Sequence, residues 1–445
     1  MLETQVLVIS LVFALVIVCI ACNLADMTLL AMLGLSVLTV AGVVTQSDIL
    51  NAIKASSGSL SLLFGGMVVA RVLAPTGVFD NLGTRFLILT RGSGKRFLLL
   101  LTALTAVICA ILPNATAVIL LAPIVVRVSE ALGVAFTGPL ILTAIISNAA
   151  GLLTLVGDPA TFLVGQAAGL SFMAYLRRIS PGGLLSILVV IPLLPALFGP
   201  AWRAHRALPP GLHPAAIERP LFCLLSVCAL AVMVGLFLVG EYMPVPIVPP
   251  SAAIIGASLA LLALHVAKYE PLEHVFRDID WRTLVFIFCM MCFVEEITKT
   301  GVMSGLSRAL YRGMGDNLLA AALALLAAIG LASGFLANIP VVAAAILLAK
   351  GYLVLTQLVP EQALGFGYAD WPSSALPVFA GMMFGGTLGG NATLIGSSAT
   401  LVAAGICASH GKPVRFVAFM RYGLPVAACQ LASTALYIWL LSRIG

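Results

Sequence analysis

The stretch TLVGDPATFLVG, residues 154–165, places a carboxylate and a helix breaker inside an apolar tract. Asp158 stands between Gly157 and Pro159, and no lysine or arginine occurs within ten residues on either side. Proline cannot continue a helix, whereas Asp followed by Pro is a strong signal for the start of one. The stretch therefore predicts two half-helices that meet at Asp158.

The composition indicates the surroundings of this break. The 445 residues are 61% hydrophobic and 9% charged, with a mean hydropathy of +1.15, against about 25% charged residues in soluble domains. Apolar stretches of about 18 or more residues recur from end to end. Since these runs are too long for strands and lack their alternation, we expect an all-α polytopic membrane protein.

Three further features of the composition receive plain interpretations. The run at 5–22 has no basic region before it, so we expect a retained transmembrane helix rather than a signal peptide. The net charge of +6 reflects basic loops and does not indicate nucleic-acid binding. The nine cysteines are scattered, mostly in apolar segments, which predicts no disulfide framework.

The chain repeats its own pattern. At an offset of 224 residues, LLFGGMVVARVLAPTGV (62–78) aligns with FIFCMMCFVEEITKTGV (286–302), and ILPNATAV (111–118) aligns with FLANIPVV (335–342). At 15 residues more, TLVGDPAT (154–161) aligns with TLIGSSAT (393–400), and five of the eight positions are identical. Three matches in the same order predict two structural repeats, an arrangement typical of secondary transporters.

We expect residues 1–200 to form the first repeat and residues 220–445 the second. The linker at 201–219, rich in Pro, Arg and His, is expected in the cytoplasm. An inverted pair of repeats needs an odd number of crossings in each. This parity results if 97–131 is a re-entrant helical hairpin with its tip at Pro113–Asn114, and 317–357 is another with its tip at 338–340.

The predicted fold is thus two inverted-topology repeats with about 10 transmembrane helices, two re-entrant hairpins and broken helices at the midplane. The broken helices are expected at 137–172 and 375–406. The other expected helices are 5–22, 27–44, 58–74, 181–199, 220–240, 250–266, 283–298 and 417–442.

Loop charge supports this topology. With the linker in the cytoplasm, the basic loops around 85–96, 268–282 and 412–415 also fall inside, and the acidic loop with Glu361 and Asp370 falls outside, as the positive-inside rule expects. Arg177, Arg178 and Arg308 fall on the opposite side.

Four breaks interrupt apolar helix, two in each repeat: PNAT (113–116), GLLTLVGDPAT (151–161), ANIP (337–340) and GGNATLIGSSAT (389–400). Freed N–H groups and helix N-termini attract anions, and freed carbonyls coordinate cations. A single break is better explained by close packing of small residues. Four breaks paired by the repeat predict one substrate site in mid-membrane.

Two acidic positions are candidates for coupling transport to a proton or cation. Asp158 is either a helix cap or a titrating group, and its repeat partner Ser397 can cap but cannot titrate. This asymmetry favours a coupling role for Asp158. Glu295 matches Arg71 in the other repeat and is either an interfacial charge or part of a proton relay with Glu296.

Cys289 and Cys292 form a CxxC within one helical turn. They are either ordinary packing residues or a thiolate pair for a soft metal or trivalent arsenic. Zinc-type sites need more ligands, so we predict no metal centre. The chain has no P-loop, which leaves an ion gradient or the solute's own gradient as the energy source.

The segments 114–125, 155–172, 335–346 and 388–406 resemble the signature segments of the ion transporter superfamily. The resemblance is to the branch of arsenical-pump membrane proteins (ArsB-like arsenite permeases), NhaD-type sodium–proton antiporters and the melanosomal P protein, and it covers nearly the whole chain. More distantly, the chain resembles the sodium-coupled dicarboxylate and citrate carriers.

The resemblance implies an elevator-type transporter with a site formed by the hairpin tips and unwound segments. The expected site residues are Asn114, Thr116, Asn148, Thr154, Gly157, Asp158, Thr161, Asn338, Asn391, Thr393, Gly396 and Ser397. Pro113 and Ala337 stand where many members have Asp, which leaves a less negative site suited to a neutral or anionic solute.

The sequence therefore predicts a non-enzymatic secondary transporter in the inner membrane of a prokaryote. The leading hypothesis is efflux of arsenite and antimonite, driven by the proton gradient or the membrane potential. The alternatives are a sodium-coupled carrier of a small anion, a sodium–proton antiporter and an ion channel. The expected partners are a small solute, H⁺ or Na⁺, and lipid; a homodimer and, for an arsenical pump, a separate ATPase subunit stay open.

Overall fold

The computed structural model describes residues 2–21, 24–206, 217, 219–336, 338–365, 368 and 370–444. Most of the predicted linker, 207–216 and 218, and Ala337 at the second hairpin tip lie outside these ranges. The described chain is helical throughout and contains no strand. By length and composition, eight of its helices could each cross a membrane, or nine if a pair bent by 101° is one span. The prediction of an all-α polytopic membrane protein is confirmed.

Three helices open the chain, and the second and third are started by side-chain caps. Asp26 accepts hydrogen bonds from the first turn of α2, and Thr45 with Asp48 forms a capping box at the start of α3. The bounds are α1 Leu2–Ala21, α2 Met27–Val40 and α3 Gln46–Leu73. The expected helix 58–74 was therefore too short at its N-terminal side, because the first turns of α3 carry polar residues that are mostly exposed and that hydropathy does not mark as part of a span.

The predicted hairpins and broken helices are present, and their helices end and begin at the predicted breaks. The first hairpin is α5 Gly94–Cys109 and α6 Asn114–Leu132, and the second is α18 Leu318–Phe335 and α19 Asn338–Leu355. The broken helices are α7 Thr137–Ala150 with α8 Pro159–Ala167, and α20 Leu376–Gly389 with α21 Ser398–Ser409. We call these eight helices the hairpin unit.

One expected crossing is interrupted. The segment 181–199 consists of α10 Ser180–Leu188, a 3₁₀ turn Ile191–Leu193, α11 Leu194–Leu197 and the start of α12 Gly199–Arg203. Pro192, Pro195 and Pro200 each stand in the first turn of one of the three later pieces, where a missing N–H costs least. Taken together, Ser180–Leu197 is still long and apolar enough to cross a membrane, so the predicted crossing is confirmed, with these interruptions along it.

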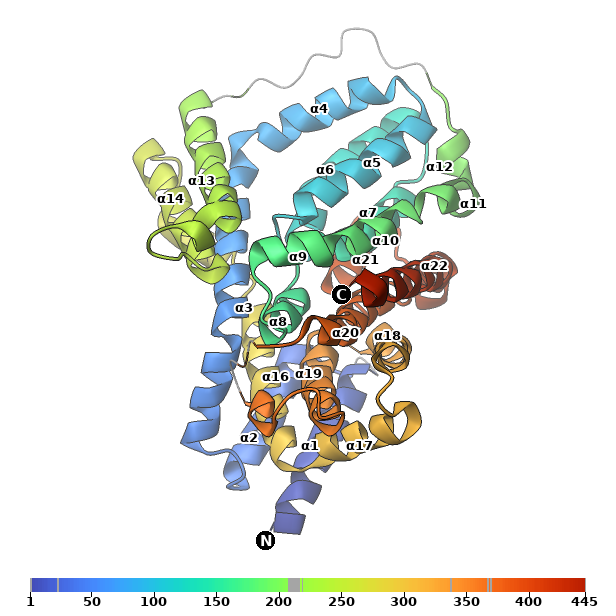
Figure 1. Ribbon diagram of the computed structural model, residues 1–445. Coiled ribbons are helices and arrows are strands. Elements are labelled where there is room, and N and C mark those ends of the chain that lie inside the picture. The colour runs from blue at the N-terminus through green and yellow to red at the C-terminus, as the bar shows by residue number, and fades with distance from the viewer. Residues whose placement is uncertain are drawn as a thin grey trace.

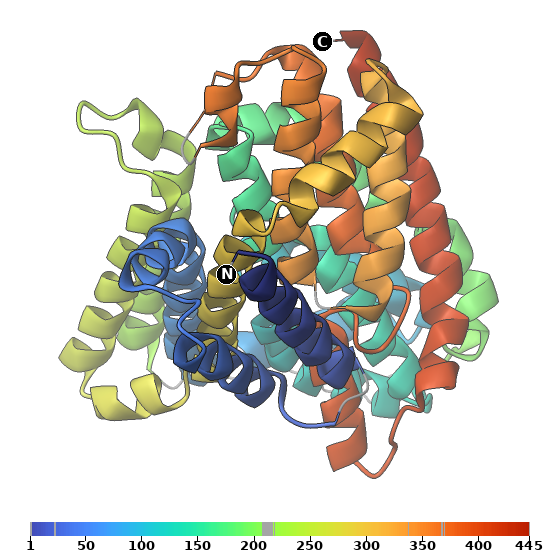
Figure 2. The ribbon, with the colours of Figure 1, turned by 90° about the horizontal axis from the view of Figure 1, so that it is seen from below.

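The remaining helices complete the two halves. They are α9 Phe172–Arg178, α13 Pro220–Val239, α14 Pro249–Ala267, α15 Leu272–Arg277, α16 Trp281–Lys299 and α22 Phe416–Ile444. Both views show α13 and α14 on one side of the molecule and α22 on the other, with the hairpin unit between them (Figures 1 and 2). Helix α3 contacts α13, α14 and α16.

Two helices that the sequence reading missed lie at opposite ends of the molecule. These are α4 Val78–Thr90 and α17 Val302–Met314, at the top and bottom of Figure 1. Each follows a glycine in the left-handed region, Gly77 with φ 77° and Gly301 with φ 73°. Thr76 and Thr300 make the same local hydrogen bonds, to the carbonyl three residues earlier and from the N–H two residues later.

Candidate functional site

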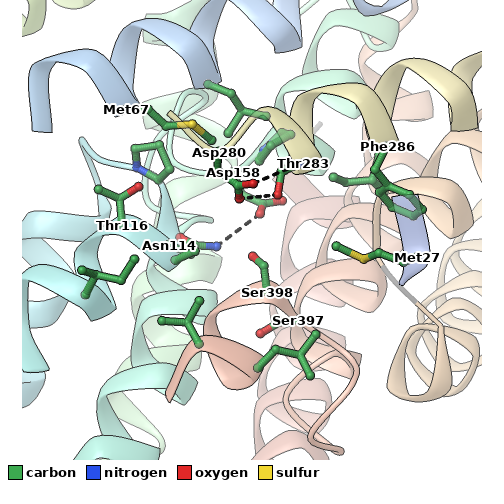
Figure 3. Close-up of a pocket in the computed structure, with 18 of the residues that line it drawn as sticks. Met27, Met67, Asn114, Thr116, Asp158, Asp280, Thr283, Phe286, Ser397 and Ser398 are labelled. Atoms are coloured by element: carbon green, nitrogen blue, oxygen red, sulfur yellow. Dashed lines mark hydrogen bonds between the residues drawn. The ribbon is translucent and has the colours of Figure 1, made fainter. Parts of the chain in front are cut away.

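A cavity of about 500 Å³ lies where the hairpin unit meets α3 and α16. On the hairpin side it is lined by both hairpin tips and both broken helices (Figure 3). On the other side it is lined by α3, the start of α16 and the turn before α2, which together we call the cavity wall. Five of the twelve expected site residues line this cavity: Asn114, Thr116, Asp158, Asn338 and Ser397.

Four helices begin at this cavity. Helices α6 and α19 start at the hairpin tips, and α8 and α21 start after the two breaks, with Asn114, Asn338, Pro159 and Ser398 as first residues. A helix N-terminus carries about half a positive charge and unpaired N–H groups. Pro113, before α6, offers no side-chain acceptor for its first turn. At α8 and α21 the side chains of Asp158 and Ser397 already accept from first-turn N–H groups, so the donors open to an anionic group are those of the uncapped first turn of α6.

Asp158 is the side chain on which the two hairpins converge. Its carboxylate caps α8 by accepting from the N–H of Ala160 at 3.0 Å and of Thr161 at 3.3 Å. It also accepts from Nδ2 of Asn114 at 3.2 Å and from Nδ2 of Asn338 at 3.5 Å. One buried carboxylate thus joins a break of the first half to hairpin tips from both halves.

Asp158 therefore caps α8, and the same geometry is compatible with its predicted role in binding. The Oδ1 atom of Asn114 and the hydroxyl of Thr161 are buried without a hydrogen-bond partner in the structure. Buried acceptors of this kind are ordinarily satisfied by protein, water or a ligand. In the second half, Ser397 caps α21 through the N–H of Thr400 at 3.3 Å, so the shared feature is the cap and the carboxylate is specific to the first half.

Thr154 and Thr393 hold the hairpins in place rather than lining the cavity. Thr154 donates its hydroxyl to the carbonyl of Ala110 at 2.5 Å, and Thr393 donates to the carbonyl of Gly334. Each contact ties a broken helix to the end of the hairpin arm of its own half. The sequence aligns these two threonines with each other, and in the structure each donates to a backbone carbonyl of a hairpin.

Gly157 and Gly396 make the breaks compact. A Cβ at Gly157 would lie 2.9 Å from the carbonyl oxygen of Gly151, and one at Gly396 would lie 2.4 Å from that of Gly390. Both distances are too short for a real Cβ, so these turns need glycine. Neither glycine lines the main cavity; their role here is to let the chain fold back on itself.

Asn148 and Asn391 belong to a buried amide chain. Asn148 donates to the carbonyl of Thr387 at 2.6 Å and to Oδ1 of Asn391 at 3.0 Å, and Asn391 donates to Gln430 at 2.8 Å. Gln430 in turn donates to the carbonyl of Ser186 at 3.0 Å. This chain links the two broken helices to α22 and α10, and Gln430 was not foreseen from the sequence.

The cavity wall carries charges that the sequence did not group. The described charged residues that line the cavity are Asp26, Arg71, Asp158, Asp278 and Asp280. Asp280 caps α16 through the N–H of Thr283 at 3.1 Å, which an Asp ahead of an apolar run could have signalled. The excess of carboxylates concentrates cations at the cavity.

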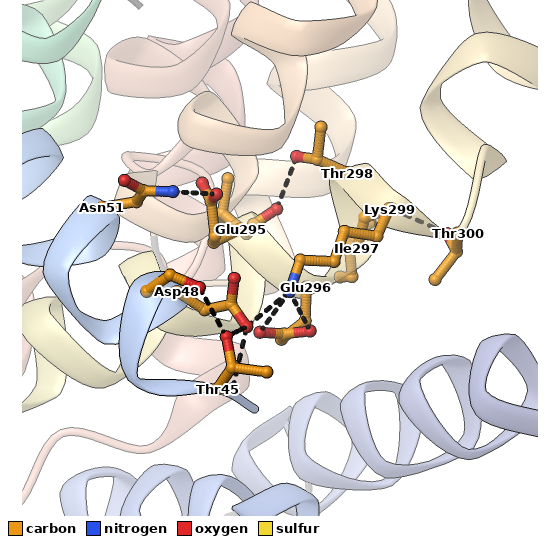
Figure 4. A network of polar contacts seen from close by, with 11 residues as sticks. Thr45, Asp48, Asn51, Glu295, Glu296, Ile297, Thr298, Lys299 and Thr300 are labelled. Carbon is orange, nitrogen blue, oxygen red and sulfur yellow. Dashed lines mark hydrogen bonds and ion pairs between the residues drawn. The ribbon is translucent and has the colours of Figure 1, made fainter. Parts of the chain in front are cut away.

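The other coupling candidate, Glu295, lies at the far end of α16 and does not line this cavity. It accepts a hydrogen bond from Asn51 of α3 at 3.1 Å (Figure 4). Beside it, Lys299 bridges Asp48 at 2.6 Å and buried Glu296 at 3.1 Å. These contacts fasten α16 to the start of α3.

Cys289 and Cys292 are buried on α16 among apolar side chains, away from the cavity lining. The described cysteines are free. No group of three or more His, Cys, Asp or Glu in the described chain is arranged to hold a metal ion.

A cavity lined by two hairpin tips and two broken helices in an all-helical membrane protein is an arrangement that membrane transporters use for their solute sites. The family model described as "Citrate transporter" (CitMHS) matches residues 13–369. The chain belongs to this family of membrane transporters.

Three comparisons agree with this assignment. An uncharacterized transporter of Synechocystis sp. is 40% identical over 97% of this chain and 96% of its own length. The human P protein is 26% identical over 98% of this chain and 60% of its own length, which confirms the expected resemblance to the P protein. The YdaH transporter of Alcanivorax borkumensis shares the fold, with a TM-score of 0.57 at 12% identity over 89% of this chain and 86% of that one.

Proposed function

We propose that the protein is a cation-coupled secondary transporter of a small carboxylate-bearing anion, with its binding site in the cavity beside Asp158. The observation that carries this proposal is the convergence of four helix N-termini on one cavity. Their dipoles, and the uncapped N–H groups at the start of α6, favour a carboxylate over a neutral or cationic solute. The family description, a citrate transporter, supports the same solute class.

A coupling cation follows from Asp158. A buried carboxylate beside a bound anion would repel it strongly unless a positive charge neutralised one of them. Binding of H⁺ or Na⁺ at Asp158 would supply that charge. The amides of Asn114 and Asn338 donate N–H groups to this carboxylate, so a bound Na⁺ would require them to turn their oxygens toward it. Solute and cation then bind together, which is the requirement for coupled transport.

Uptake by purified protein in liposomes tests the proposal. Citrate and a four-carbon dicarboxylate are offered under an inward proton gradient, an inward sodium gradient or no gradient. We expect one of these carboxylates to accumulate only with a cation gradient. If neither accumulates under either gradient, the proposed function is wrong; sodium-driven proton release without any solute would instead indicate the sodium–proton antiporter.

Efflux of arsenite and antimonite is the second candidate. It is favoured by the amide and hydroxyl groups that surround Asp158, because these can hydrogen-bond a neutral trihydroxide without a charge partner. The buried CxxC would take no part, since it lies off the cavity. The same liposomes, loaded with arsenite or antimonite, test this function, and a separate ATPase partner would be sought only if efflux occurs.

The proposed movement is of elevator type. The cavity lies between the hairpin unit and the cavity wall, so a displacement of one against the other would carry the site across the membrane. The matched caps at Gly77 and Gly301, and the matched contacts of Thr154 and Thr393, support two repeats at 1–200 and 220–445. The basic loops favour the inner membrane of a prokaryote, with the linker in the cytoplasm.

A further inference from the structure

Arg71 is the basic side chain among the described residues that line the cavity. It lies on the face of α3 formed by Leu63, Met67, Ala70 and Ala74, all of which also line the cavity. One turn earlier, Gly66 packs so closely on the first hairpin tip that an added Cβ would be 2.9 Å from Cδ of Pro113. Five residues of helix, about 7–8 Å, separate this contact from Arg71.

Both edges of the Arg71 guanidinium are occupied by carboxylates of the protein. Glu270 takes the outer edge with two bonds, from Nη1 at 2.9 Å and from Nη2 at 3.1 Å. Asp278 takes the inner edge with one bond from Nε at 2.8 Å. These contacts use three of the five guanidinium donors, and both edges of the fork carry a carboxylate, so a further carboxylate can bind an edge with two bonds only by displacing one of the two.

The two carboxylates differ in how firmly they are held. Glu270 is bound twice, is 15% exposed, does not line the cavity and also lies 3.5 Å from Nδ1 of His274. Asp278 is bound once by Arg71, is 39% exposed and faces the cavity. It also has a second partner at hand, because Nε of Arg277 lies 3.7 Å from its Oδ1.

We propose that Arg71 is a binding residue for the carboxylate of the transported solute, and that Asp278 occupies this position until the solute displaces it. This inference rests on the proposed carboxylate function and adds the residue that recognises the solute on the cavity wall. Glu270 keeps the guanidinium in place during the exchange, and Asp278 turns to Arg277. The exchange trades one charge-assisted hydrogen bond for another and breaks no covalent bond.

The test compares the KM for carboxylate uptake in liposomes among single variants. Asp278→Asn removes the competing charge, so we expect the KM to fall by roughly threefold, the scale of one exposed ion pair. Arg71→Lys keeps a charge but loses the fork, and we expect the KM to rise by roughly tenfold. Melting of each detergent-solubilised variant shows whether it is folded, and Asp278→Asn leaves the half-buried pair of Arg71 and Glu270 intact.

Glu273→Gln is the matched control, since it removes one negative charge from exposed Glu273 of neighbouring α15, which does not line the cavity. We expect its KM to equal that of the wild type. If Asp278→Asn behaves like this control while the wild type transports carboxylates, Asp278 is not displaced and this inference is wrong. If the wild type takes up no carboxylate, the proposed function fails as well.

Discussion

At the scale of single residues, Asp158 combines two tasks that usually fall to different side chains. Its cap of α8 would be met equally well by a serine, as Ser397 shows at the corresponding place. A carboxylate there adds a buried charge whose cost is repaid by four donated hydrogen bonds, two of them from hairpin tips. Since capping alone does not require the charge, we propose that the carboxylate of Asp158 takes part in binding.

Thr154 and Thr393 allow a matched prediction about stability. Replacing either by Val removes a hydroxyl that satisfies a hairpin carbonyl, so we expect each change to lower the free energy of unfolding by about 1 kcal/mol. Thermal melting in detergent measures this, and Thr→Ser at the same positions, which keeps the hydroxyl, is the control. Equal melting temperatures for the Val and Ser variants would show that these contacts do not hold the hairpins.

The sequence could identify residues at the breaks but not their partners. Asn114, Asn338 and Asp158 were predicted because Pro, Gly and Asn mark interruptions in apolar helix. Arg71 and Asp278 could not be grouped, since 207 positions separate them along the chain and their meeting depends on how α15 folds back on α3. Thr154 was predicted as a site residue because the sequence shows that its side chain is polar but not which way that side chain points.

At the scale of secondary structure, α3 is a contact surface as well as a span. Gly66 allows this helix to touch the first hairpin tip at Pro113. Any movement of the hairpin unit against the cavity wall must pass this contact.

This closeness predicts that Gly66→Ala slows transport. The added Cβ would meet Pro113 at 2.9 Å, so the tip must shift. We expect the maximal uptake rate to fall several-fold while the protein still folds. Gly235→Ala on α13 is the control, because a Cβ there meets nothing within 4 Å. An uptake rate equal to that of the control would contradict a moving contact at Gly66.

Helices α4 and α17 show which elements the sequence reading missed. Hydropathy selects segments that cross the membrane, whereas these two helices lie at the ends of the molecule and are amphipathic. The repeated Thr–Gly–Val at 76–78 and 300–302 was visible, but only the left-handed φ of the two glycines shows that it starts a helix. The N-terminal part of α3 was missed for a related reason, since its polar and mostly exposed residues lower the hydropathy there.

At the scale of the whole molecule, one cavity lies where the two predicted repeats meet. Each half supplies a hairpin tip and a broken helix, and both tips reach the same carboxylate. We infer that the duplication provides the cavity and that its asymmetry, Asp158 against Ser397, provides the coupling. The fold could be predicted because matching segments recur in the same order in both parts of the sequence. The acidic residues of the cavity wall could not be grouped from the sequence.

Asp278 is one acid of the cavity that we expect not to contribute to the pH dependence of uptake. The hydrogen bond from Arg71 holds the pKa of Asp278 below its ordinary value. An acid with a lowered pKa stays ionised until the pH falls below that pKa, so between about pH 5 and pH 8 Asp278 keeps its charge. Changes of uptake with pH in this range therefore do not arise from Asp278.

The most direct test of the central claim is cation-driven uptake by Asp158→Asn in liposomes, beside the wild type. The amide keeps the side chain's size and one acceptor for α8 but cannot carry a charge. We predict that the variant still exchanges solute across the membrane while accumulation driven by the proton or sodium gradient is lost. Accumulation that persists at the wild-type level, with the same dependence on the gradient, would contradict the account and leave Asp158 as a helix cap.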